Sequence, residues 1–357
     1  MYRRSGVLAL LMLLAVAGFG ILGDHRVGAQ QATPATSPTP PIEEEERVEK
    51  VETESVNVLF TAQDRNRKLI LTLKQEDIRV LENGQPQEIS AFSRQIDLPL
   101  SLAILIDTSA SQERTLPEEK AAAISFLESV IRPNKDEVAV ISFTGESTLE
   151  QGMTSNMTRL RRAIERVQFI PPSGYLGGGV VVNSGRVPGT PPISGTNQQI
   201  QGSTAIWDSI WITSSDVLGP APERTRRAII LLSDGYDTFS KKKLDEAVQA
   251  AQRAEAVVYA IGIGDNFYDG VNEGSLKKIS ERTGGRAYFP RDETELRQAF
   301  RQIQEEMRSQ YLIAYEPSNR ALDGSYRKIE IQIVNQELEK QKVRLTHRGG
   351  YFAKTKK

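Results

Sequence analysis

Residues 101–112, "SLAILIDTSASQ", give the clearest indication of the fold class of this chain. Residues 102–106 form an uninterrupted apolar run, which is typical of a strand buried on both faces of a parallel sheet. The residues that follow carry oxygen in their side chains: Asp107, Thr108, Ser109 and Ser111. Ligands of open parallel sheets bind at the carboxyl ends of the strands. The stretch therefore predicts a core strand that presents one carboxylate and three hydroxyls at a ligand-binding edge.

Further apolar runs of this kind occur throughout residues 99–310. The apolar runs "EVAVISF", "RAIILLSD", "AVVYAIGIG" and "GRAYF" alternate with amphipathic segments such as 117–131 and 205–218. This alternation predicts the α/β class, with a doubly wound, mostly parallel sheet that helices cover on both faces. The polar run "STLEQGM" predicts an antiparallel edge strand, and Thr115 to Glu118 fits a helix capping box.

Two β-rich flanks, residues 54–98 and 311–353, enclose this α/β segment. They contain short alternating runs that are typical of strands, among them "SVNVLFTAQ" at 55–63 and "LILTL" at 69–73. Asn83-Gly84 lies between two such runs and predicts a hairpin turn. Because a few strands alone are too small for independent stability, we expect the flanks to pair with each other. The predicted result is a small β-sandwich-like module into which the α/β domain is inserted.

The amino-terminal residues 1–29 predict a signal peptide or, if they are not cleaved, an N-terminal anchor. They contain Arg3 and Arg4, then a long apolar run, and end in the small residues "VGA". The Pro-, Thr- and Glu-rich residues 30–53 predict a disordered linker. We therefore expect the folded part to be exported and periplasmic, cell-surface or secreted. The Gly- and Pro-rich insertion 171–203 is longer than ordinary connections, which indicates a functional or disordered loop.

The composition excludes several classes of chemistry. The chain has no cysteine, which excludes thiolate catalysis, cysteine-bound zinc and disulfides, and its histidines are only His25 and His347. The net charge is −1, and it becomes −3 when residues 1–29, with three arginines and one aspartate, are removed. Such a balance argues against nucleic acid as a partner. Gly262 and Gly264 follow an apolar run, but the third glycine of a dinucleotide motif is missing, so no nucleotide is expected.

Two more segments place oxygen-bearing side chains at the same predicted edge. Thr204 lies at the start of a predicted helix in "GSTAIWDSI", and Asp234 follows the apolar run of "IILLSDGYD". With the first stretch they give five candidate metal ligands: Asp107, Ser109, Ser111, Thr204 and Asp234. Hydroxyls and carboxylates without nitrogen or sulfur suit a hard cation, and an octahedral oxygen set favours Mg²⁺ or Mn²⁺.

These five residues resemble the metal-ion-dependent adhesion site (MIDAS) of the von Willebrand factor A (VWFA) domain. The pattern of that family is Asp-x-Ser-x-Ser, then a Thr, then an Asp-Gly after a central strand, and the resemblance covers residues 101 to about 310. The flanks and the ending "QYLIAYEPSNRALDGSYRKIEIQI" are further similar to the secreted bacterial, acidobacterial-type VWFA-related domain proteins. Two positions depart from the pattern: Ala110 stands where many members have Gly, and Ser203 replaces the second Gly of the usual Gly-Gly-Thr.

The resemblance implies a non-catalytic module for protein binding and cell adhesion. Ser109 and Ser111 would bind the metal directly, and Thr204 would bind it directly or through a water. Asp107 and Asp234 would act mostly through waters. Because the nearest ligands are neutral, the cation would accept an Asp or Glu carboxylate from a partner protein. A membrane would be a partner only through an uncleaved N-terminal anchor.

Two other functions are compatible with the same residues. A Mg²⁺-dependent hydrolase or phosphotransferase of the haloacid-dehalogenase-like kind needs a second Asp two residues after the nucleophile, where this chain has Ser109. A structural scaffold would use the metal only to staple loops together. Asp237 could assist the metal site, but we expect it to arrange its loop with Ser240 and to cap the next helix.

Overall fold

The computed structural model describes residues 55–94, 98–169, 203–222, 225–264 and 270–355. The targeting segment and linker predicted for residues 1–53 lie outside these ranges, as does the insertion predicted for 171–203 except its last residue. Within the described ranges, no helix is both long enough and apolar enough to cross a membrane.

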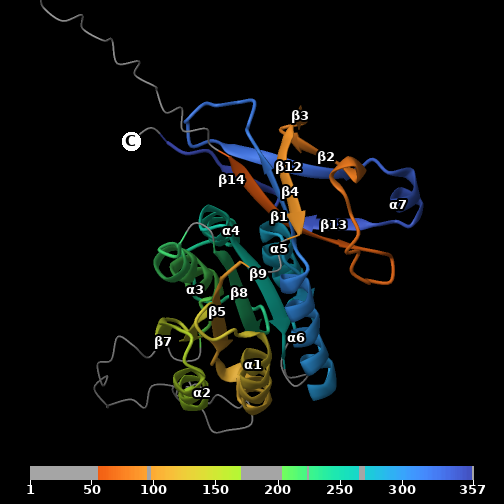
Figure 1. The fold of residues 1–357 in the computed structure, drawn as a ribbon. Coiled ribbons are helices and arrows are strands. Elements are labelled where there is room, and N and C mark those ends of the chain that lie inside the picture. The colour runs from red at the N-terminus through yellow and green to blue at the C-terminus, as the bar shows by residue number, and fades with distance from the viewer. Residues whose placement is uncertain (1–54, 95–97, 170–202, 223–224, 265–269, 356–357) are drawn as a thin grey trace, which may run out of the picture. The chain divides into compact units, whose positions relative to one another are not determined.

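A six-stranded sheet forms the centre of the α/β part (Figure 1). Its strands lie in the order β10 (Ala287–Tyr288), β9 (Ala256–Gly262), β8 (Arg226–Ser233), β5 (Leu100–Asp107), β6 (Glu137–Phe143) and β7 (Ser147–Thr154). All neighbours are parallel except β7, which is antiparallel to β6 and confirms the predicted edge strand. The chain passes from β5 to β6 on one side and later to β8 on the other. The carboxyl ends of β5 and β8 therefore flank the switch point where such sheets bind ligands.

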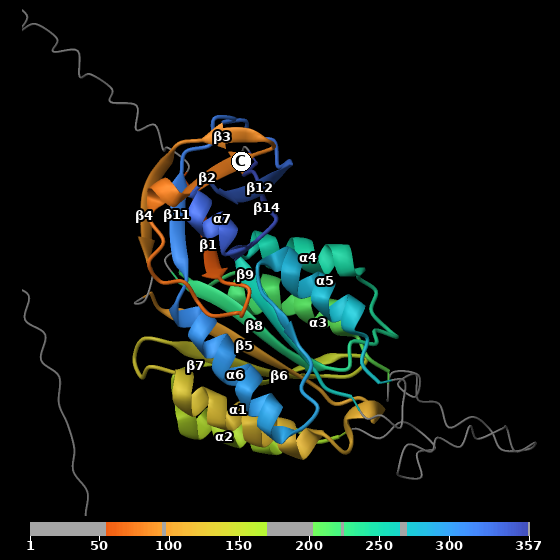
Figure 2. The same ribbon diagram turned by 90° about the vertical axis from the view of Figure 1, so that its right-hand side faces the viewer.

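Helices cover both faces of this sheet, which confirms the predicted α/β class (Figures 1 and 2). One face packs against α1 (Leu116–Val130), α2 (Met157–Arg166) and α6 (Glu293–Arg308). The other packs against α3 (Ile206–Ile212), α4 (Leu244–Arg253) and α5 (Glu273–Thr283). The apolar run of β5 has no polar interruption because its even-numbered residues enter the first core and its odd-numbered ones the second.

One local prediction in this part was wrong. Thr115 precedes α1 but does not cap it, because its hydroxyl donates to Gln112 Oε1 at 2.9 Å instead of accepting from the helix. The predicted helical segment 205–218 is helical over almost its whole length, but α3 ends at Ile212 and a π-helical turn, Thr213–Leu218, continues it.

The two flanks build a module of two four-stranded antiparallel sheets (Figure 2). One sheet has the order β13 (Arg344–His347), β1 (Val56–Gln63), β11 (Tyr311–Tyr315) and β4 (Ile89–Arg94). The other has β14 (Gly350–Phe352), β12 (Tyr326–Ile333), β2 (Ile78–Glu82) and β3 (Gln85–Gln87), and a short helix, α7 (Gln336–Lys340), follows β12. Each sheet mixes strands from both flanks, so the chain leaves this sandwich after β4 and returns to it at β11.

In the sandwich, the Asn-Gly turn is predicted correctly from the sequence, whereas one predicted strand does not form. Asn83 and Gly84 join β2 to β3 with positive φ angles of 48° and 81°, as an Asn-Gly hairpin requires. The alternating run 69–73 forms only an isolated bridge at Leu69. Its backbone is instead bound by the Tyr311 hydroxyl, which accepts from Leu73 N at 3.0 Å and donates to Ile70 O at 3.1 Å.

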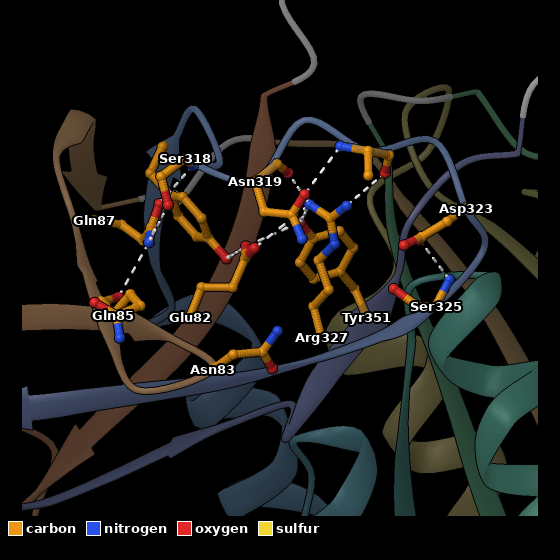
Figure 3. A network of polar contacts seen from close by, with 12 residues as sticks. Glu82, Asn83, Gln85, Gln87, Ser318, Asn319, Asp323, Ser325, Arg327 and Tyr351 are labelled. Carbon is orange, nitrogen blue, oxygen red and sulfur yellow. Dashed lines mark hydrogen bonds and ion pairs between the residues drawn. The ribbon is translucent and has the colours of Figure 1, made fainter.

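A buried ion pair joins the two flanks inside the sandwich (Figure 3). Arg327 Nη1 lies 3.4 Å from Glu82 Oε1, and both side chains are 2% exposed. The other carboxylate oxygen accepts from the hydroxyls of Tyr315 and Tyr351, each at 2.9 Å. The guanidinium also donates to backbone carbonyls of the loop that leads into β12, at Asn319 and Ala321. The pair thus fixes that loop as well as the two strands.

Candidate metal centre

Asp107, the last residue of β5, is fully buried and has both oxygens engaged. Oδ1 accepts from the backbone N–H of Ser109 at 2.9 Å, and Oδ2 accepts from the hydroxyl of Ser233 at 2.6 Å. The first bond turns the chain directly after the strand. The second ties the ends of the neighbouring strands β5 and β8 together.

The turn after Asp107 brings two predicted ligands together. A 3₁₀ turn over Ala110–Gln112 leaves the hydroxyl oxygens of Ser109 and Ser111 3.2 Å apart. Gln112 supports this turn, because its buried amide donates to Ile263 O at 3.1 Å, just beyond β9. Two hydroxyls at such a separation present adjacent oxygen donors.

Asp234 follows β8 directly, next to the end of β5. Its Oδ1 accepts from Tyr236 N at 3.0 Å, across Gly235, whose φ is 82°. A Cβ at Gly235 would lie 2.8 Å from the Leu276 side chain and 2.9 Å from a backbone oxygen, so the turn requires glycine. Asp234 is buried, and its charge acts on Asp107.

Thr204 is positioned by the loop that follows Asp234. Its N–H donates to the Thr238 hydroxyl at 2.8 Å, and its carbonyl accepts from the N–H groups of Thr238 and Phe239. The next residue, Ala205, donates to Thr144 O at 2.7 Å, just beyond β6. Thr204 is therefore held at the same sheet edge by loops from β6 and β8, and not by a direct contact with the serines.

The charge of Asp234 disfavours the charged form of Asp107. Burial and the neighbouring charge of Asp234 together raise the pKa of Asp107 to about 7. The hydrogen bonds from Ser233 and Ser109 work in the opposite direction but do not offset this rise. Two buried carboxylates that interact in this way favour the binding of a cation.

A third carboxylate, Glu119, lies buried on the core face of α1. It is fully buried, and neither of its oxygens accepts a well-formed hydrogen bond from the described residues. Burial, together with the charges of Asp107 and Asp234, raises the pKa of Glu119 to about 8, although the nearby Thr115 hydroxyl lowers it. Glu119 was not predicted as a site residue from the sequence, although it falls on the apolar stripe of the helix with Leu116 and Ala123.

Two residues that hold the ligand loops, Ser233 and Gln112, were not predicted. Their only signal in the sequence is that each lies next to a candidate ligand. For Asp237, a helix cap was predicted, but on the wrong helix. Asp237 does act as a cap with Ser240, but it caps α3 rather than the next helix, since its Oδ1 accepts from Ile206 N at 2.8 Å.

The donor set is rich in hydroxyls and poor in carboxylates. In the part of the chain that the structure describes, no group of three or more His, Cys, Asp or Glu side chains is arranged to hold a metal. The five predicted ligands include only two carboxylates, so a site made from them would depend on the hydroxyls of Ser109, Ser111 and Thr204. This composition fits a hard cation and not zinc-type nitrogen or sulfur ligation.

Comparison with protein families matches most of this α/β part. The sequence model of the von Willebrand factor type A domain matches residues 193–302, and a second model with the same description matches residues 102–183. These two ranges contain all five predicted ligands. No curated protein matches the chain.

Solved structures with a similar fold come from animals and bacteria. Proximal thread matrix protein 1 from the mussel byssus, in a form with a zinc-occupied MIDAS motif, is 17% identical over 63% of this chain, with a TM-score of 0.45. An aerotolerance-related membrane protein from Bacteroides fragilis is 16% identical over 58% of this chain and 100% of its own, with a TM-score of 0.41. The conserved hypothetical protein BatB from Bacteroides thetaiotaomicron is 17% identical over 59% and 100%, with a TM-score of 0.39. This chain covers 49% of the mussel protein.

Proposed function

We propose that this chain, whose α/β part is a von Willebrand factor type A domain, is an exported module that binds a partner protein through a divalent metal ion. The proposed ligands are Asp107, Ser109, Ser111, Thr204 and Asp234, and the proposed ion is Mg²⁺ or Mn²⁺. The partner would supply an Asp or Glu carboxylate to the metal. Export rests on the signal peptide predicted for residues 1–29.

One observation carries the metal proposal: two buried carboxylates and a pair of adjacent hydroxyls meet at the switch point of the sheet. The pKa of Asp107 is raised by burial and by Asp234, so the metal-free site holds an unfavourable negative charge. A cation would remove that penalty. Ser109 and Ser111, with oxygens 3.2 Å apart, would add neutral donors.

The neutral donors also support the choice of partner. Hydroxyls leave most of the positive charge of a bound cation uncompensated, and the two aspartates are already engaged by Ser233, Ser109 and Tyr236. A foreign carboxylate is the complementary ligand for such an ion. The proposed activity is therefore binding rather than catalysis, and no side chain is assigned the role of a nucleophile or a general base.

Metal binding is tested by titrating the purified protein with MgCl₂ and MnCl₂ in a calorimeter. Asp107→Asn preserves the size of the side chain but removes its charge, and we expect it to weaken binding by at least about 100-fold, the upper range seen for groups that support metal sites. Asp245→Asn, an exposed change on α4, is the matched control and should bind like the wild type. Equal affinity in all three proteins would refute the site.

The partner is tested by capturing cell-envelope proteins of the source organism on the immobilised protein. We expect a partner that is retained in Mg²⁺ and released by EDTA, and that is not retained by Thr204→Ala. Thr294→Ala, an exposed change on α6, should retain it. If metal raises the melting temperature but Thr204→Ala captures the same proteins as the wild type, the metal only staples the loops and the binding function is wrong.

A further inference from the structure

A cavity of about 580 Å³ lies at the opposite edge of the central sheet from the candidate metal centre. Strands of the sandwich line one side of it, with Leu59, Leu312 and Ala314, and the start of β9 lines the other, with Val257. Its volume falls within the usual range of small-molecule sites. Arg226 opens β8 and Asp234 follows the end of that strand, so the two sites are separated by the length of β8, about 25 Å at 3.3 Å per residue.

Arg226 is a buried cation in the wall of this cavity, and it has no anionic partner among the described residues. It is 6% exposed, and its guanidinium donates to the backbone carbonyls of Met307 and Leu98. Its Nε has no acceptor within the described ranges. Burial and the positive charge of Arg132 lower the pKa of Arg226, whereas the charge of Asp136 raises it. Arginines are seldom buried to this extent unless they are paired.

The nearby carboxylates of Asp136 and Glu255 are paired with other arginines. Asp136 accepts two bonds from the Arg132 guanidinium, at 2.7 and 2.8 Å. Glu255 also lines the cavity. Its Oε1 lies 3.1 Å from Arg348 Nη1, and its Oε2 lies 3.8 Å from Arg227 Nη1. Arg226 therefore has no carboxylate hydrogen-bonded to it among the described residues, and the charge of Asp136 that acts on it is shared with Arg132, beside a largely apolar space.

We infer that this cavity is a second ligand site, which binds a monoanionic carboxylate with an apolar chain. The carboxylate would pair with Arg226, and the chain would lie along the aliphatic side chains of Leu59, Val257 and Leu312. This inference does not depend on the proposed metal function, because the two sites share no residue.

The test uses dodecanoate as the probe. The full chain is kept in EDTA so that the candidate metal centre does not contribute to the measured binding. Calorimetry should show saturable binding of dodecanoate, and no binding of dodecanol or acetate, which lack the charge or the chain. Arg226→Gln should weaken dodecanoate binding by at least about tenfold, the value of one buried hydrogen bond to a charged group. Arg253→Gln, an exposed arginine outside this cavity, should leave the affinity unchanged.

A second variant protects the test against misfolding. Ala314→Phe places a ring in the cavity and leaves Arg226 intact, so it should abolish binding in a protein whose circular dichroism matches that of the wild type. If Arg226→Gln does not fold, the result for Ala314→Phe decides. Absence of dodecanoate binding to the wild type, equal binding of dodecanol, or unchanged affinity in Ala314→Phe would each overturn the inference.

Discussion

Arg327→Met is expected to destabilise the protein by about 3–5 kcal/mol, the usual cost of removing one partner from a buried ion pair. The substitution leaves the Glu82 carboxylate 2% exposed without its cation. It also removes the donors that hold the carbonyls of Asn319 and Ala321. Urea unfolding followed by far-ultraviolet circular dichroism measures the change.

The neighbouring residue supplies the control for this prediction. Lys328 lies on the same strand with its side chain 66% exposed, and Lys328→Met should change the free energy of unfolding by less than about 0.5 kcal/mol. Combining Arg327→Met with Glu82→Leu should restore part of the lost stability, because neither charge of this buried pair then remains. A loss below about 1 kcal/mol in Arg327→Met would contradict the role assigned to the pair.

Glu119→Gln is expected to stabilise the metal-free protein at neutral and alkaline pH and to have little effect near pH 5. Burial raises the pKa of Glu119 from its ordinary 4.5 to about 8, so the folded state keeps a proton that the unfolded state loses. Stability therefore falls as pH rises between these two values, by about 1.4 kcal/mol per pH unit at most. The neutral amide of the variant does not titrate, so this contribution disappears.

Thermal unfolding in EDTA from pH 5 to pH 8.5 tests this prediction. The melting temperatures of the wild type and Glu119→Gln should diverge as pH rises, whereas Glu118→Gln, at the exposed neighbouring position, should follow the wild type. Asp107 titrates in all three proteins, so only the difference between them reports on Glu119. Parallel curves would show that Glu119 is not protonated in the folded state near neutral pH.

The sequence was sufficient to predict the architecture because the deciding signals are local. The apolar run of β5 and its abrupt change at Asp107 give both the buried strand and its ligand-binding end. Asn83-Gly84 determines its hairpin through backbone angles alone. The five candidate ligands lie at one sheet edge because parallel strands bring their carboxyl ends together, and hydrogen bonds join Asp107, Ser109 and Ser111 directly.

The groups that were missed act through contacts between distant parts of the chain. Nothing near Glu82 indicates that its partner is Arg327, and nothing near Arg226 indicates a cavity. Thr115 fits a capping box in sequence, but Gln112 competes for its hydroxyl once the 3₁₀ turn has formed. The run 69–73 alternates like a strand, yet the Tyr311 hydroxyl binds its backbone instead of a neighbouring strand. Such competition is decided by tertiary structure.

The interleaved flanks have a consequence for how the chain is made. Strand β1 pairs with β11 and β13, and β2 pairs with β12, so most of the first flank's partners leave the ribosome only after the whole α/β part. The α/β part can fold as soon as α6 has been synthesised, while β1 and β4 still have open edges. A nascent or truncated chain that ends before residue 311 therefore exposes strands that can associate with other chains.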